Sequence, residues 1–179
     1  MSDTSFITRS PEETGAFGRR LAERLRPGVV VGLIGDLGSG KTCLVQSICA
    51  SLGVTGQVTS PTFVLINEYP GTDGAGQPLP VYHFDLYRLL GDEELHDLGS
   101  DDYFYGDGVC LVEWADMAGD LLPEDHTSIR IEHLGENERR FEVTWGGLGS
   151  LSQVRRVLAQ WNAENAERLS EGRFGEVKA

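Results

Sequence analysis

The chain has 179 residues, and 28 acidic side chains against 15 Lys and Arg give it a formal net charge of -13. This length fits one domain, which can bury roughly 70% of the surface that its unfolded chain exposes. The acidic charge argues against strong direct nucleic-acid binding, because Lys and Arg are needed to neutralise phosphates. No segment approaches the roughly 20 apolar residues that span a bilayer, and the N-terminus has no signal-peptide core, so we expect a soluble, cytoplasmic protein.

The first elements can be predicted from their boundaries. Residues 10–13, Ser-Pro-Glu-Glu, are typical of a helix start with a capping box, and Pro27-Gly28 ends that helix. Residues 29–34 are apolar on both faces, which indicates a buried parallel strand. A helix follows, with Leu44, Ile48 and Leu52 on one face and Gly53 at its end.

The remaining elements are shorter. An antiparallel pair of strands is expected, joined by the Gly- and Pro-rich segment 70–80, which we expect to be a mobile loop. Then come an acidic helix, a buried strand that ends at Glu113-Trp114, a closing hairpin and a last helix. The expected ranges are strands 63–69, 81–86 and 109–112, helix 92–98, hairpin strands 129–133 and 141–145, and helix 151–169.

This order of elements predicts an α/β fold of the P-loop NTPase type. We expect a three-layer sandwich with a mostly parallel sheet and antiparallel hairpin additions. We expect residues 1–179 to form a single domain with a core at about 10–146. A C-terminal helix at 150–170 and a frayed tail at 172–179 would follow that core.

Residues 35–42, Gly-Asp-Leu-Gly-Ser-Gly-Lys-Thr, match the pattern G-x-x-x-x-G-K-[ST] in full. The glycines let successive backbone N–H groups point inward and form an anion-binding nest at a helix N-terminus. We expect Lys41 to reach the β- and γ-phosphates and the Thr42 hydroxyl to bind magnesium. The expected nucleotide contacts in this loop are Asp36, Leu37, Gly38, Ser39, Gly40, Lys41, Thr42 and Cys43.

Two carboxylates, Asp85 and Glu113, stand at the ends of predicted buried strands. P-loop enzymes use such a residue to hold magnesium or to position the attacking nucleophile, and the sequence leaves open which of the two binds the metal directly. His83 is expected to be a half-buried strand residue. Between residues 27 and 128, Lys41 and Arg88 are the only Lys or Arg. Arg88 is therefore a candidate for stabilising γ-phosphate charge, or for pairing with nearby acids.

A turn with a hydroxyl follows the P-loop helix at Ser60-Pro61-Thr62-Phe63. Thr62 could sense the γ-phosphate, as switch residues do, and a plain turn before a strand explains it nearly as well. The cysteines lack CxxC spacing, so we expect reduced core thiols, with Cys43 on a buried helix face.

Four segments in this order resemble the bacterial TsaE (YjeE) family: residues 35–42, residues 60–63, the segment His-Phe-Asp-Leu-Tyr-Arg-Leu at 83–89, and Leu-Val-Glu-Trp at 111–114. The resemblance covers about residues 10–141. It implies a P-loop ATPase, with ATP and Mg²⁺, that is required for threonylcarbamoyl modification of tRNA adenosine beside the anticodon. The resemblance also implies that the protein acts on the TsaB–TsaD complex.

The same resemblance suggests roles for individual residues. It implies Thr42 and Glu113 as magnesium ligands, and Asp85 as a catalytic or metal-organising carboxylate. Thr14 and Arg139 match positions near the adenine. Together with the P-loop pattern, the expected catalytic residues are Lys41, Asp85, Arg88 and Glu113.

Two other functions stay open at this point. A small-molecule kinase could use the same scaffold, although such enzymes usually enclose phosphates with several lid arginines and the central region has only Arg88. A nucleotide-dependent binding module without hydrolysis would need neither Asp85 nor Glu113. The acidic stretches 92–97 and 101–102 could steer docking onto a basic partner or only solubilise the domain.

Overall fold

The computed structural model describes residues 4–89 and 91–145. The predicted C-terminal helix and tail therefore lie outside the described residues. The elements are β1 (Thr4–Thr8), α1 (Pro11–Ala22), β2 (Val30–Ile34), α2 (Lys41–Ser51), β3 (Ile66–Tyr69), β4 (Val81–Asp85), α3 (Asp92–Asp97), α4 (Ser100–Phe104), β5 (Val109–Glu113), the 3-10 helix η1 (Ala115–Leu121), β6 (Thr127–His133) and β7 (Arg139–Trp145).

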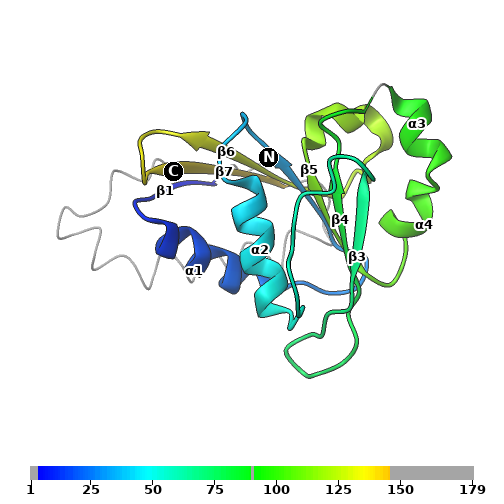
Figure 1. Cartoon of the computed structure of the whole chain (residues 1–179), viewed down its shortest axis with the longest axis horizontal. Helices are drawn as coiled ribbons and strands as arrows, with labels where there is room; N and C mark the ends of the chain where they lie inside the picture. The colour runs from blue at the N-terminus through cyan, green and yellow to red at the C-terminus, as the bar shows by residue number, and fades with distance from the viewer. Residues whose placement is uncertain (1–3, 90, 146–179) are drawn as a thin grey trace.

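Within these residues the strands form one seven-stranded sheet of order β1-β7-β6-β2-β5-β4-β3 (Figure 1). The central strands β6, β2, β5 and β4 pair in parallel. The outer strands β3, β7 and β1 each join by an antiparallel pairing. The predicted α/β fold with antiparallel additions is confirmed, and the sheet is mixed, with three parallel and three antiparallel pairings.

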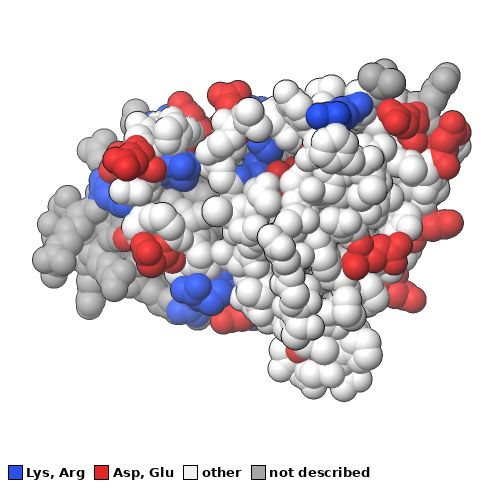
Figure 2. All heavy atoms as spheres, viewed as in Figure 1, with Lys and Arg blue, Asp and Glu red and all other residues white. Residues whose placement is uncertain are grey.

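Helices cover both faces of the sheet and make three layers. The long helices α1 and α2 pack on one face, and α3, α4 and η1 pack on the other, where Leu95, Phe104 and Ala118 are buried. The outer surface of α3 and α4 carries a group of acidic side chains (Figure 2), among them the exposed Asp97, Asp101 and Asp102. In the part of the chain that the structure describes, no helix is long and apolar enough to cross a membrane.

The topology brings the predicted site residues to one edge of the sheet. Because β2, β5 and β4 are parallel, their carboxyl ends meet, and ligands bind at that edge in open α/β sheets. β2 leads there into the glycine loop, while Asp85 and Glu113 end β4 and β5 as direct partners in the register. The predicted helix after the loop is α2, which begins at Lys41.

Several predicted boundaries were wrong, and three elements were missed. β1, α4 and η1 were not predicted from the sequence. β3 begins at Ile66 instead of Phe63, because Val64 N–H and Leu65 N–H both donate to the carbonyl of Pro61, at 3.0 and 2.7 Å. Leu65 has a φ of 64°, which an extended strand does not allow. Phe63 is left 84% exposed on this turn.

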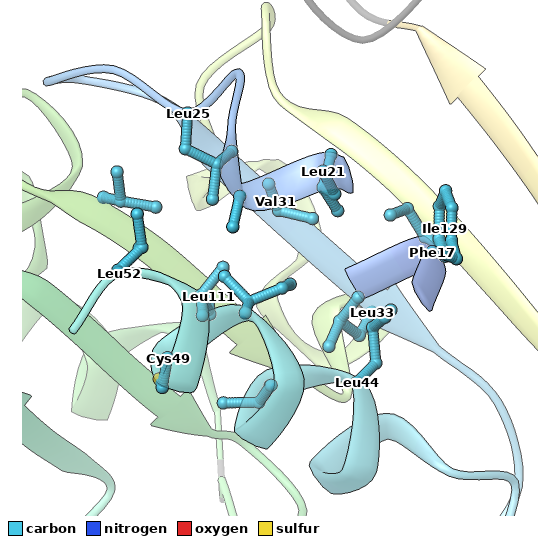
Figure 3. Close-up of a cluster of buried hydrophobic side chains, with 14 of the residues drawn as sticks. Phe17, Leu21, Leu25, Val31, Leu33, Leu44, Cys49, Leu52, Leu111 and Ile129 are labelled. Atoms are coloured by element: carbon cyan, nitrogen blue, oxygen red, sulfur yellow. The ribbon is translucent and has the colours of Figure 1, made fainter. Parts of the chain in front are cut away.

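The core between the sheet and the long helices is apolar and close-packed (Figure 3). Side chains from α1 and α2 meet side chains from β2, β5 and β6, among them Val31, Leu111 and Ile129. At one end of this core the ring of Phe17 lies 4.8 Å from that of Phe6 and 5.3 Å from that of Phe141, measured between centroids. Phe17 thus joins α1 to β1 and β7.

We expect Phe17→Ala to lower the free energy of unfolding by about 3–5 kcal/mol, the usual cost of deleting a buried phenylalanine ring. Urea unfolding followed by circular dichroism measures this loss. Phe63→Ala is the matched control, since an exposed ring can be removed at a cost of less than about 0.5 kcal/mol. Equal losses in the two variants would contradict the place of Phe17 in the core.

Candidate functional site

The glycine loop between β2 and α2 has a shape that only glycine permits at two positions. Gly35 has a φ of 154°, and a Cβ at this residue would collide with the carbonyl oxygen of Ile131. Gly40 caps α2 with a φ of 110°, in the left-handed region. Between them the hydroxyl of Ser39 is buried and has no hydrogen-bond partner among the described residues. The loop therefore holds an unpartnered polar group beside a helix N-terminus, which is a ready site for an anion.

Lys41 is folded back onto this loop. Its ammonium donates to the carbonyl oxygens of Gly35, at 2.6 Å, and Asp36, at 3.0 Å. The ammonium also lies 3.8 Å from the centroid of the Trp114 ring, a cation–π distance. Burial lowers the pKa of Lys41 below its ordinary value, and attraction to the Glu113 carboxylate acts in the opposite direction.

Thr42, on the first turn of α2, is bonded to the end of β5. Its hydroxyl lies 2.8 Å from Glu113 Oε1 and 3.0 Å from Oε2, and it donates its single proton to this carboxylate. Glu113 also contacts His83, whose Nε2 lies 2.9 Å from Oε1. His83 was expected to be half-buried, and this was wrong: its side chain is fully buried and carries a polar contact into the site.

The carboxylate of Asp85 forms a second hydrogen-bonded group in the same region, together with two hydroxyls. Its Oδ2 accepts hydrogen bonds from the hydroxyls of Ser60 and Thr62, the latter at 2.8 Å. Its Oδ1 accepts the backbone N–H of Tyr87 at 3.0 Å. The structure thus connects the 60–62 turn to β4 through one carboxylate, and Ser60 is a member of this group that the sequence did not single out.

A cleft of about 580 Å³ lies between α1, α2 and the β6–β7 turn, with Gly40 and Cys43 on its wall. The predicted residues Thr14 and Arg139 line this cleft. Arg139 also bonds to the glycine loop, since its Nε donates to the carbonyl of Ser39 at 2.8 Å. A cleft of this volume is in the range of small-ligand sites.

Arg88 and Leu37, two predicted site residues, have exposed side chains. The guanidinium of Arg88 is exposed and stacks over the Phe63 ring, with 4.5 Å from Cζ to the centroid. Leu37, at the tip of the glycine loop, is 82% exposed. The expectation that Cys43 is buried was wrong, because this thiol is exposed in the cleft.

Trp114 is a site residue that the sequence signalled only through its place next to Glu113. It has a φ of 57°, an unusual backbone conformation for a bulky residue, and such strain clusters at functional sites. Its ring packs against Tyr87 at 4.9 Å as well as beneath the Lys41 ammonium. The Trp114 ring therefore forms the surface against which the Lys41 ammonium packs.

The donors at this edge suit a nucleotide with magnesium. Asp85 and Glu113 are each only 3% exposed, and buried carboxylates require a compensating cation or donors. Among the described residues no group of three or more His, Cys, Asp and Glu could hold a metal by itself. Magnesium bound with phosphates does not need such a cage, because one or two protein oxygens with phosphates and waters complete its shell. Thr42 and Glu113 supply oxygens of that kind.

Comparisons with known proteins agree with one another. The family model described as Threonylcarbamoyl adenosine biosynthesis protein TsaE matches residues 8–141. A Bacillus subtilis protein named tRNA threonylcarbamoyladenosine biosynthesis protein TsaE is 43% identical over 150 residues, or 84% of this chain and 89% of that one. The protein of the same name from Streptomyces coelicolor is 44% identical over 135 residues, or 74% and 88%. The crystal structure of Bacillus subtilis YdiB matches with a TM-score of 0.74 and 37% identity, covering 90% of this chain and 97% of that one.

The three thiols should react at very different rates in the folded protein. Burial raises the pKa of both Cys49 and Cys110 to about 12. At pH 8 only about one in ten thousand of these thiols is then the reactive thiolate. We expect Ellman's reagent to modify Cys43 quickly and the other two only after unfolding. Cys43→Ser should remove the fast phase, and a fast phase that survives in this variant would contradict the burial of the other two thiols.

Proposed function

Since the chain belongs to the TsaE family of threonylcarbamoyl adenosine biosynthesis proteins, we propose that it is a P-loop ATPase that binds ATP with magnesium and hydrolyses it slowly. Its place of action would be the threonylcarbamoyl modification of tRNA adenosine beside the anticodon, on the TsaB–TsaD complex. The observation that carries the ATPase proposal is the hydrogen bond between the P-loop threonine, Thr42, and the strand-end carboxylate of Glu113.

The phosphates would lie along the glycine loop at the N-terminus of α2. Backbone N–H groups and the free hydroxyl of Ser39 offer donors there, and the helix dipole favours negative charge. Lys41 would exchange its bonds to the Gly35 and Asp36 carbonyls for phosphate oxygens. Because the lysine is already buried next to the loop, little reordering of its side chain is required.

The nucleoside would occupy the cleft beside the loop. Gly40 and Cys43 form part of its wall, so the cleft opens directly beside the start of α2. Arg139 and Thr14 lie on the same cleft, which supports their assignment near the base. Adenine as the preferred base rests on the family relationship.

Thr42 and Glu113 would hold magnesium, which when bound supplies positive charge against the phosphates. Asp85 would organise the reacting end of the site through the 60–62 turn, since it accepts from Thr62. We propose that Thr62 leaves Asp85 when it senses the γ-phosphate, so that this turn changes with the nucleotide state. Arg88 would stabilise γ-phosphate charge after leaving the Phe63 ring, on which it now stacks.

The acidic surface favours a protein partner over tRNA itself. The net charge is -13, and the acidic side chains over α3 and α4 would repel phosphates (Figure 2). We propose that these helices help to steer the protein towards TsaB and TsaD. The low intrinsic hydrolysis that we expect fits a protein whose partners complete its catalytic set.

We expect Lys41→Ala to abolish measurable ATP binding. Loss of a buried charged contact costs roughly 3 kcal/mol or more, and roughly 1.4 kcal/mol is a tenfold change in affinity, so the affinity should fall by about 100-fold or more. Isothermal titration calorimetry measures this loss. Arg140→Ala, which removes an exposed cation paired with Glu132, is the control and should bind ATP as the wild type does. Full-strength binding by Lys41→Ala would refute the phosphate site.

Phosphate release tests the hydrolysis. We expect the protein alone to turn over slowly and the addition of TsaB and TsaD to raise the rate. Glu113→Ala should spare ATP binding measured without magnesium and lower magnesium-dependent turnover by about 100-fold or more, because the magnesium that stabilises charge in the transition state loses a ligand. If neither the protein alone nor the mixture with TsaB and TsaD releases phosphate, the ATPase proposal fails and a binding module without hydrolysis becomes the better description.

A further inference from the structure

His83 is a buried polar residue to which the proposed mechanism gives no task. Its side chain is 0% exposed, and its Nε2 lies 2.9 Å from Oε1 of Glu113. The other ring nitrogen, Nδ1, is buried without a hydrogen-bond partner among the described residues. Because a carboxylate accepts hydrogen bonds, the proton belongs on Nε2, and His83 is the donor of this pair.

Packing alone does not account for a histidine at this position. In the register of β4 and β5, His83 is paired with Leu111. This pair lies on the same face as Asp85 and Glu113, two residues before them along each strand. Leu111 and Val81, its neighbours on this face, belong to the apolar core. A buried imidazole with one unpaired nitrogen opposes folding where a leucine would not. The bond to Glu113 is therefore the feature that distinguishes histidine here.

The hydrogen bonds hold Glu113 at two points. Thr42 has one hydroxyl proton and lies within bonding distance of both carboxylate oxygens. When that proton bonds to Oε2, His83 still donates a hydrogen bond to Oε1. Since Thr42 and His83 come from α2 and β4, the carboxylate on β5 is fixed between three elements.

We propose that His83 is a positioning residue for Glu113, which holds the carboxylate towards Thr42 and so determines how much magnesium strengthens nucleotide binding. This inference rests on the proposed function, because it requires Thr42 and Glu113 to hold the metal. Hydrogen-bond partners of metal ligands typically contribute 10- to 100-fold to metal affinity. His83 would act through Glu113 without touching the nucleotide.

The test is the affinity for ADP, measured by calorimetry in EDTA and again with magnesium. The ratio of the two dissociation constants reports the metal-dependent part. We expect His83→Leu to reduce this ratio by about 10- to 100-fold while the affinity in EDTA stays within about twofold of wild type. His83→Gln, whose amide nitrogen can replace Nε2 as donor, should retain most of the ratio. Electron paramagnetic resonance can count the Mn²⁺ bound in the presence of ADP. The amount bound should rank the variants in the same order as the ratio does.

Val81→Ala is the matched structural control. Val81 is buried on the same strand and the same face, two residues before His83. This variant should lower Tm and leave the ratio unchanged. If His83→Leu does not reach the wild-type circular dichroism spectrum, His83→Met replaces it, since methionine has a similar size and no donor.

The outcomes separate the two proposals. A folded His83→Leu or His83→Met with the wild-type ratio would overturn the role of His83 and leave the nucleotide site intact. An equal loss in EDTA and in magnesium would also overturn it, because the residue would then be structural. Loss of the ratio in His83→Gln would contradict the hydrogen bond as the cause. A wild-type protein that binds no ADP would overturn the proposed function, and the inference with it.

Discussion

The hydrogen bond between Thr42 and Glu113 is the point at which helix, loop and sheet meet. It joins the first turn of α2 to the end of β5, and it forms only because parallel β2 and β5 end at the same edge. The glycine loop determines the position of Thr42, because Gly35 must pass close to the carbonyl oxygen of Ile131 on β6. The position of one hydroxyl therefore depends on the order of three neighbouring strands.

Much of this arrangement is predictable from the sequence because it follows from local chemistry. Gly35 and Gly40 adopt backbone angles that few other residues tolerate, and Lys41-Thr42 follow them directly. The apolar run of β2 and the carboxylate that ends β5 are local patterns of the same kind. Such features depend on neighbours in the chain, so a single sequence contains most of the information.

The mistakes concern contacts between distant segments. The full burial of His83 depends on β3 and β5, the strands on either side of it, where Asn67 and Leu111 are its partners in the register. Local sequence around His83 does not reveal these neighbours. Cys43 lies on α2, and its exposure depends on the cleft that α1 and the β6–β7 turn leave beside it. Phe63 and Val64 look like strand residues, yet they remain exposed on a turn held by the Pro61 carbonyl. The apolar character of Phe63 and Val64 predicted burial, but the turn leaves both side chains in solvent.

β1 was missed because its partner, β7, lies far away in the sequence, and pairing such as Phe6 with Phe141 leaves no local signal. This strand has a practical consequence for handling the protein. The motif-bearing region suggests a natural start near Ser10, but a chain shortened to that point would leave the N–H and C=O groups along β7 uncovered. An uncovered edge strand is a template for association with other chains. Residues 4–8 thus cover the edge of β7, although none of them belongs to a recognisable motif.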